Sequence, residues 1–302
     1  MSSSISPTTG KKYRVELVCH VGGFPRGSFY AQRKRTEHAQ ASTNPPPPSK
    51  KRGPKTPISD EDLLDLIRRD LKGSPWTGEG HRKVHARLKL DGVQVGRSRV
   101  LGLMRTHGLL SPHRIRLAND GAHDGTIVTD APGVLWATDG TKVQTVEEGN
   151  AWIFCAVEHW NGECLGAYVT KTGNRFAALQ PISKALGSIY GSVGKGVAQG
   201  LGLRMDHGCQ YTSDDFLHQL RFWGITPDFG LVGQPETNGV AERFFRTLKE
   251  QAIYGRIFRT IEDLRKAVLD FVETYNTAWR LEKNSYLTPR EMRESLKEKV
   301  AA

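Results

Sequence analysis

The feature that most constrains the fold is a change of pattern near residue 125, beyond which strand-like segments replace helical periodicity. Three β-branched and aromatic runs follow one another: VLWATDGTKVQT at 134–145, AWIFCAVEHW at 151–160 and CLGAYVT at 164–170. Glycine, asparagine and a Lys-Thr-Gly sequence bound these runs. The pattern therefore predicts three consecutive antiparallel strands.

After these runs, predicted helices and strands alternate. The sequence indicates a helix with an internal proline at 175–191, a short buried strand LRMD at 203–206, a helix at 212–224 and a strand ITPDF at 225–229. Because such alternation is typical of chains that build a sheet covered by helices, it predicts an α/β fold.

Before residue 125 the apolar residues recur at helical spacing. A serine followed by acidic residues precedes the segment at 60–73, and two further helical patterns follow, HRKVHARLKLDG at 81–92 and RSRVLGLMRTHG at 97–108. Three helices with tight turns predict a compact all-α helix-turn-helix domain at 58–116. Basic side chains occur on the last two helices: Arg82, Lys83, Arg87, Arg97, Arg99 and Arg105. A plain helical bundle with a charged surface is the alternative.

A proline-rich segment separates this domain from the N-terminus. Residues 43–57, TNPPPPSKKRGPKTP, contain six prolines and a basic cluster, a composition that favours an extended linker. Before it, YRVELVCHVGGFPRGSFYAQRKR predicts a short helix, a turn and a second helix. We therefore expect a small helix-turn-helix-like DNA-binding module at 1–42.

The positive charge is concentrated in the first part of the chain. Residues 1–120 hold 23 Lys and Arg against 10 Asp and Glu, a net +13, whereas residues 121–302 hold 20 against 22, a net −2. Such an asymmetry favours a polyanionic partner, and nucleic acid is the expected one. A solubilising surface is the alternative interpretation.

Hydropathy and cysteine usage exclude other classes of protein. No apolar run approaches the roughly 18 residues that a membrane span needs, so no membrane partner is expected. The four cysteines show no CxxC pair and no metal-ligand spacing, which favours reduced thiols and a cytoplasmic location.

Three carboxylates occupy positions that this layout would bring together. Asp139 is expected at the end of the first strand, Asp206 at the end of the fourth, and Glu242 on a helix that opens after LVGQPETN. If the first and fourth strands are neighbours in the sheet, their ends meet. Gly140 follows the first aspartate, and Gly208, close to the second, is expected to adopt a positive φ in a sharp turn.

The helix predicted around Glu242 carries other polar groups on the same side. A step of roughly 100° per residue places Asn238, Arg246 and Lys249 within about 40° of the face of Glu242. One helical stripe would thus hold an amide, a carboxylate and two cations. The alternative is a surface helix with an ordinary pair between Glu242 and Arg246, which would stabilise it by about 0.3–0.5 kcal/mol.

Several neighbouring polar residues are expected to have no role in catalysis. Glu158 and Glu163 flank a predicted strand turn and are expected to be solvated. Asp214 and Asp215 stand at a helix start and are expected to cap it. His207 is expected to pack or to form a hydrogen bond.

Three sequence blocks carry a resemblance to a known family. WATDGT, MDHGCQYTSDDF and GQPETNGVAERFFRTLKE resemble the signature blocks of the DDE integrase core, and the whole chain resembles the second-frame (OrfB) transposases of the insertion-sequence-three family. The resemblance implies an RNase H-like core with a mixed five-stranded sheet at 125–255, preceded by all-α helix-turn-helix modules. A C-terminal helical segment at 256–302 follows, in which Trp279-Arg280-Leu281 departs from the commoner Arg-Pro-His pattern.

The resemblance also implies what the site residues do. Asp139, Asp206 and Glu242 become the catalytic triad, which holds Mg²⁺, with Mn²⁺ as a substitute. Two such ions about 3.5–4 Å apart can clamp an in-line displacement at phosphorus. The residues expected to contact DNA near this site are Asn238, Arg246, Lys249, Gln210 and Tyr211, and those on the helix-turn-helix domain are Arg82, Lys83, Arg97 and Arg99. Packing is an equal alternative for Gln210 and Tyr211.

The expected partner is double-stranded DNA, as transposon ends with terminal inverted repeats and as target. The resemblance implies a homo-multimer on DNA, allows for an OrfA partner or an OrfAB fusion, and implies a bacterial, nucleoid-associated protein. Two other functions stay open, a domesticated DNA-binding protein without catalysis and an RNase H-like nuclease.

Overall fold

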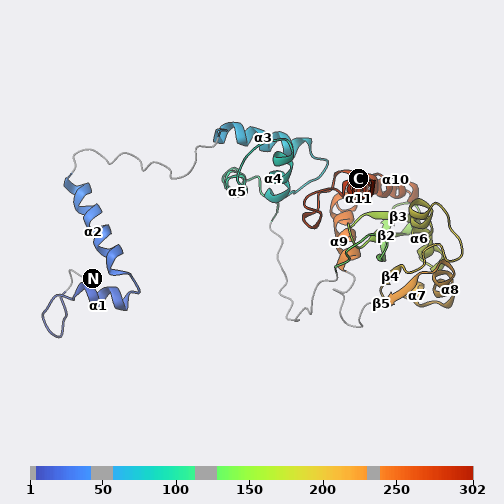
Figure 1. Cartoon of the computed structure of the whole chain (residues 1–302), viewed down its shortest axis with the longest axis horizontal. Coiled ribbons are helices and arrows are strands. Elements are labelled where there is room, and N and C mark those ends of the chain that lie inside the picture. Colours follow the sequence, from blue (N-terminus) through green and yellow to red (C-terminus); the bar gives the residue numbers. More distant parts are fainter. Residues whose placement is uncertain (1–4, 42–56, 113–127, 230–238, 302) are drawn as a thin grey trace. The chain divides into compact units, whose positions relative to one another are not determined.

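A computed structural model describes residues 5–41, 57–112, 128–229 and 239–301, and the chain divides into two compact units, Met1–Pro57 and Ile58–Ala302 (Figure 1). In the first unit, α1 (Val15–Val21) and α2 (Arg26–Ala41) form the short helix, turn and longer helix that the sequence predicts. Of the predicted linker, all but Pro57 lies outside the described residues.

The second unit begins with three helices, α3 (Asp60–Gly73), α4 (His81–Leu90) and α5 (Arg97–Thr106). The hydroxyl of Ser59 accepts a hydrogen bond from the backbone N–H of Asp62 at 3.0 Å, which caps α3. The core of this domain consists of Leu63, Ile67, Val84, Leu88, Val100 and Met104. The predicted all-α domain and its helix positions are thus confirmed.

A mixed five-stranded sheet follows, in the order β3-β2-β1-β4-β5. Its strands are β1 (Leu135–Thr145), β2 (Gly149–Glu158), β3 (Cys164–Thr170), β4 (Gly202–Met205) and β5 (Thr226–Phe229). β1 pairs antiparallel with β2, and β2 with β3, whereas β4 pairs in parallel with β1 and with β5. The five strands agree with those predicted from the sequence. The first and fourth strands are neighbours, which is the condition under which the two aspartates were expected to meet.

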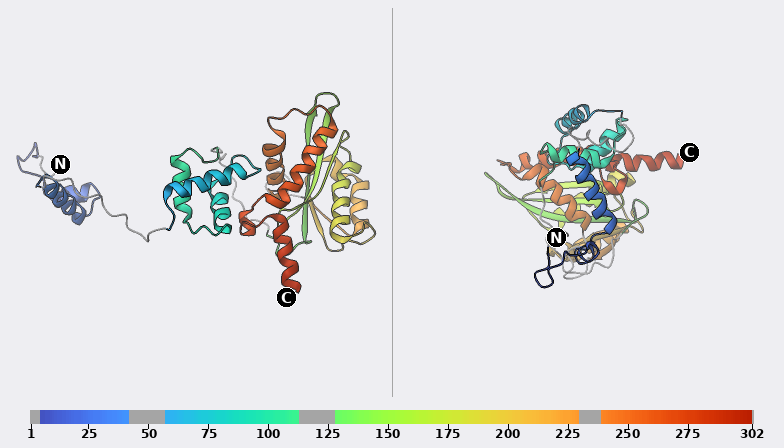
Figure 2. Two further views of the ribbon diagram at one scale, coloured as in Figure 1. Left: turned by 90° about the horizontal axis from the view of Figure 1, so that it is seen from above. Right: turned by 90° about the vertical axis from the view of Figure 1, so that its left-hand side faces the viewer.

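Helices cover both faces of this sheet (Figure 2). On one face lie α6 (Arg175–Tyr190), α7 (Cys209–Thr212) and α8 (Asp214–Trp223). On the other lie α9 (Gly239–Leu248) and α10 (Ile261–Ala278). Successive side chains of β2 enter the two cores alternately, with Ile153, Cys155 and Val157 on the α9 and α10 side and Phe154 and Ala156 on the other.

Between α9 and α10 the chain forms a π-helix, η2 (Lys249–Ile253), which the sequence did not predict. A π turn is rare because its hydrogen bonds span five residues instead of four, and it occurs often at functional sites. It continues α9 directly, so the two form one helical run.

The C-terminal segment is packed into the same core. Side chains of α10, including Leu264, Val268 and Phe271, belong to the hydrophobic cluster that covers the sheet. After it come η3 (Glu282–Asn284) and α11 (Pro289–Ala301). The segment expected to follow the core is therefore part of it. No described helix is both long enough and apolar enough to cross a membrane.

Candidate active site

The register of β1 and β4 sets the height of the two predicted aspartates. The last pair that joins these parallel strands is Ala137 with Arg204, and Asp139 and Asp206 each follow two residues later. Parallel neighbours that advance equally keep their residues level, so both carboxylates leave the sheet at the same height. The sequence predicted that Asp139 would end its strand, and this prediction is wrong. β1 continues to Thr145 and pairs there with β2 alone.

The backbone N–H groups of two glycines donate to these carboxylates. The N–H of Gly140 donates to Asp139 Oδ1 at 2.7 Å, and that of Gly208 donates to Asp206 Oδ1 at 2.9 Å. The positive φ predicted for Gly208 is wrong, because its φ is −58°. Its small size matters instead, since a Cβ there would lie 2.9 Å from Asp206 Oδ1 and 2.6 Å from Gln210 Nε2.

Glu242 lies in the first turn of α9, on the side that faces away from the core. Strong amphipathicity orients this helix: Ala241, Phe244, Phe245 and Leu248 are buried, whereas Glu242 and Arg246 are exposed. Lys249, the first residue of η2, is half-buried.

The three carboxylates influence one another electrostatically. The pKa of Asp139 is raised to about 6, first by burial and further by the negative charges of Asp206 and Glu242, while the Gly140 N–H and Lys249 act to lower it. Groups that perturb one another in this way lie in one electrostatic environment. The structure thus places Asp206, Glu242 and Lys249 near enough to Asp139 for their charges to act on its pKa.

The donor set suits a hard divalent cation in its chemistry, because three carboxylates supply oxygen ligands and a cation would offset their mutual repulsion. Among the residues that the structure describes, however, no three or more His, Cys, Asp or Glu side chains are gathered closely enough to hold a metal ion. Binding a cation would have to draw the carboxylates closer together.

Comparisons with known proteins agree with this architecture. The profile of the family described as "Integrase core domain" matches residues 223–289, and that of the "HTH-like domain" matches residues 59–116. The protein assigned as the transposase of insertion sequence element IS986/IS6110 from Mycobacterium tuberculosis is 29% identical over 236 residues, which cover 72% of this chain and 82% of the relative. The transposase for insertion sequence element IS629 from Shigella sonnei is 24% identical over 222 residues, covering 70% and 72%.

The chain is thus similar in sequence to insertion-sequence transposases, and it contains the matched HTH-like and integrase core domains. Its sheet is the RNase H-like sheet of an integrase core, as the sequence predicted. Among solved structures, the catalytic core domain of BIV integrase is similar, with a TM-score of 0.39, 22% identity, and coverage of 56% of this chain and 99% of that one.

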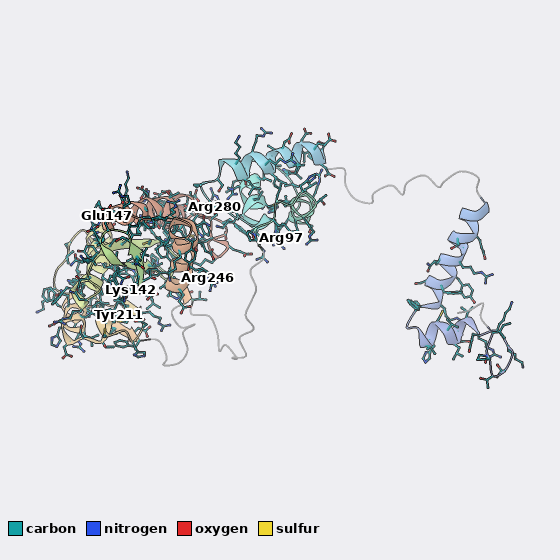
Figure 3. The ribbon with its side chains drawn as sticks, turned by 180° about the vertical axis from the view of Figure 1, so that it is seen from behind. Arg97, Lys142, Glu147, Tyr211, Arg246 and Arg280 are labelled. Carbon is teal, nitrogen blue, oxygen red and sulfur yellow. The ribbon has the colours of Figure 1, made fainter. Side chains whose placement is uncertain are left out.

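The other residues predicted near the site differ in accessibility. Arg246 is exposed on α9 (Figure 3), and Gln210 is half-buried. Tyr211 is fully buried, its ring 5.4 Å from that of Phe216 in an edge-on contact, so the packing interpretation holds for it rather than the DNA contact. Asn238 lies outside the described residues.

The four cations predicted to bind DNA from the HTH-like domain fall into two groups. Arg97 and Arg82 are accessible, although Arg82 forms an ion pair with Glu282 at 2.8 Å. Lys83 and Arg99 are engaged within the protein. The side chain of Lys83 is 18% exposed and lies 3.4 Å from Glu79, and that of Arg99 is 23% exposed and lies 2.6 Å from Asp60.

Two acidic residues expected to be solvated are instead buried. Glu158 accepts hydrogen bonds from the indole N–H of Trp136 at 3.0 Å and from the backbone N–H of Gly133 at 2.9 Å. Glu163 is paired with Arg293 at 3.0 Å. The prediction was wrong because both carboxylates find donors that only the folded chain supplies. Asp215 likewise forms an ion pair, with Arg175 at 2.6 Å, and His207 stacks on Phe229.

Proposed function

We propose that this chain is a DNA transposase that nicks and joins DNA through Asp139, Asp206 and Glu242. One observation carries the proposal: Asp139 and Asp206 leave neighbouring parallel strands at the same height, and the charges of Asp206 and Glu242 act on the carboxyl group of Asp139, although 66 and 35 residues separate the three along the chain. Repulsion between these carboxylates lowers the stability of the fold. A site that binds cations beside a phosphodiester would account for their placement.

The metal proposed for the site is Mg²⁺, with Mn²⁺ as a substitute, held by the three carboxylates. When bound, such ions stabilise charge on the attacking and leaving oxygens of an in-line displacement. The chain's own residues would orient the DNA. Arg246 and Lys249, on the same helical run as Glu242, supply positive charge for the phosphates next to the scissile bond. Asn238 is proposed to orient Glu242 or a phosphate.

The proposed substrate is double-stranded DNA, both as transposon ends with terminal inverted repeats and as target. The net charge of +13 over residues 1–120 and the HTH-like domain support this partner. We also propose that the ends are paired by a homo-multimer, with an OrfA partner or an OrfAB fusion as further components.

Substitutions in the triad test this function. Asp206→Ala and Glu242→Gln are expected to retain binding to a duplex that carries the inverted repeat flanking the gene, and to lose Mg²⁺-dependent nicking of it by at least about a hundredfold. A matched control is Glu262→Gln, a change to an exposed glutamate on α10. Undiminished nicking by either triad variant would remove the assignment. If the wild-type chain binds the repeats but cuts no substrate with any divalent metal, the chain is a DNA-binding protein without catalysis.

A further inference from the structure

The loop between α3 and α4 connects the HTH-like domain to the catalytic core. Trp76 in this loop is 7% exposed and belongs to the hydrophobic cluster that covers the sheet, not to the core of its own domain. Its ring meets those of Phe271 and Trp279 edge-on, with centroids 5.8 and 5.0 Å away. The loop therefore contributes a side chain to the core built by α10.

The next residue, Thr77, is bonded to the helical run that carries Glu242. Its backbone N–H and its hydroxyl donate to Gln251 Oε1 at 3.1 and 3.3 Å, and Gln251 Nε2 donates back to the Thr77 carbonyl at 3.1 Å. Gln251 lies in η2, nine residues after Glu242 on the same run. One side chain thus satisfies both backbone groups of Thr77, which fixes the loop against α9 and η2 in direction as well as in distance.

Buried charges hold the loop itself in shape. The carboxylate of Glu79 is 1% exposed and lies 2.6 Å from Arg87 and 3.4 Å from Lys83. It also accepts a hydrogen bond from the Ser74 hydroxyl at 2.7 Å. A buried carboxylate with this many partners tolerates little displacement, because each lost partner would leave charge unpaired.

The same network reaches the core directly. The ammonium group of Lys83 lies 2.9 Å from the centroid of the Trp279 ring, a cation–π contact, and 3.4 Å from Glu79. Nearby, Arg82 pairs with Glu282 at 2.8 Å. Trp279, which departs from the commoner family pattern in sequence, is thus the residue on which both Trp76 and Lys83 rest. The HTH-like domain lies beside this segment in Figure 2.

We propose that the contact between the α3–α4 loop and η2 sets the position of DNA bound by the HTH-like domain relative to the catalytic carboxylates. Thr77 and Gln251 are the positioning residues. This inference rests on the proposed function. Because α9 is a short helix of ten residues continued by η2, a displacement of Gln251 is transmitted along the run to Glu242. DNA bound to α4 or α5 would then be held at a fixed distance from that carboxylate, and the loop would set where the strand is cut.

The test uses the full chain and three variants, Thr77→Val, Thr77→Ser and Gln251→Leu. Valine has the shape of threonine without its hydroxyl, serine keeps the hydroxyl, and leucine replaces the whole amide. The control is Gln180→Ala, because Gln180 is an exposed glutamine whose amide bonds only a carbonyl of its own helix, at 3.4 Å. Thermal unfolding of each protein checks that the variants are folded.

Two measurements are expected to respond together. In Gln251→Leu, hydrogen exchange at the amides of η2 and of Tyr254, which donates to the Lys249 carbonyl at 2.7 Å, rises about tenfold or more. With a duplex that carries the flanking inverted repeat, kcat for Mg²⁺-dependent nicking falls about tenfold, KM stays within about twofold, and cuts spread to neighbouring phosphates. Thr77→Val is expected to show smaller changes in both measurements. Thr77→Ser and Gln180→Ala are expected to behave as the wild type.

Failure of the proposed function and failure of this inference alone give different results. A wild-type chain that never nicks DNA overturns the proposed function and this inference with it. A wild-type chain that nicks, with Gln251→Leu cutting at the same phosphate and the same kcat, overturns this inference alone and leaves the transposase assignment intact.

Discussion

The side chain of Asn276 forms two hydrogen bonds with the backbone of Cys164, accepting from its N–H at 3.0 Å and donating to its carbonyl at 2.8 Å. Because β3 is at the edge of the sheet, this amide takes the place of a further strand. Asn276→Ala would leave two buried backbone groups unsatisfied. It is expected to lower the free energy of unfolding by about 2–4 kcal/mol in urea titrations, without abolishing the fold.

Thr277→Ala is the matched control for this change. Its hydroxyl is exposed and donates to carbonyls of its own helix, that of Glu273 at 2.7 Å and that of Thr274 at 3.4 Å. Its loss is expected to change stability by less than about 0.5 kcal/mol. Equal losses in the free energy of unfolding from the two substitutions would show that the hydrogen bonds of Asn276 to β3 do not stabilise the fold.

Gly208 offers a test of how closely the second carboxylate is held. Its φ of −58° is acceptable for alanine, so Gly208→Ala is expected to change stability by less than about 1 kcal/mol. The new Cβ would nevertheless meet Asp206 Oδ1 at 2.9 Å and displace it. Mg²⁺-dependent nicking is therefore expected to fall about tenfold or more.

A comparable glycine without such neighbours is the control. A Cβ at Gly194 would meet no atom within 4 Å, and its φ is not positive, so Gly194→Ala is expected to nick DNA at the wild-type rate. If Gly208→Ala also nicks DNA at that rate, the position of Asp206 is not critical to the reaction.

Buried His159 predicts loss of stability in mild acid. Its pKa is lowered to about 4, first by burial and then by Lys283 and Arg204, against the opposing charge of Asp228. In the unfolded chain a histidine has a pKa of about 6.5, so below that pH the unfolded state takes up a proton that the folded state refuses until about pH 4. His159 therefore costs no stability above pH 7, and at pH 5 it lowers the free energy of unfolding by about 2 kcal/mol.

His159→Gln isolates this effect, because all other groups titrate in both proteins. Unfolding in urea at pH 7.5, 6 and 5 is expected to show the wild type losing stability relative to the variant as the pH falls. A constant difference across this range would show that His159 is not held neutral.

The sequence predicted the helices and strands well because their hydrophobic periods are strong. The runs at 134–170 alternate between the two covered faces of the sheet, and the three helices of the HTH-like domain have clear stop signals such as Gly73. Glu158 and Glu163 were misjudged because a charged residue in a turn is usually solvated. Their donors, which include Trp136 and Arg293, come from distant parts of the chain.

Contacts between domains lay beyond prediction for a similar reason. Gln251 and Thr77 are ordinary polar residues 174 positions apart, and no local pattern marks either of them. Trp279 was noticed only as a departure from the family pattern, and its contact with Trp76 follows from the tertiary packing alone.

Two arginines on α5 separate DNA binding from domain stability. Arg97, its first residue, is exposed (Figure 3), whereas Arg99 is bonded to Asp60 at 2.8 Å and to the Ile58 carbonyl at 2.8 Å. We expect Arg97→Ala to weaken binding to a duplex and to reduce the slope of log Kd against log salt by about 0.9, because one phosphate contact is lost. The free energy of unfolding of this variant is expected to stay within about 0.5 kcal/mol of that of the wild type.

Arg99→Ala is expected to do the reverse. It removes a tie between α5 and the start of α3, so it should cost about 1 kcal/mol of stability, a modest figure because Asp60 is 54% exposed, and leave the salt slope unchanged. Binding titrations between about 50 and 200 mM salt, together with urea unfolding of each variant, measure both quantities. If Arg99→Ala lowers the salt slope and Arg97→Ala does not, the DNA-facing side of α5 is the one that carries Arg99, and the accessible side chain of Arg97 has another role.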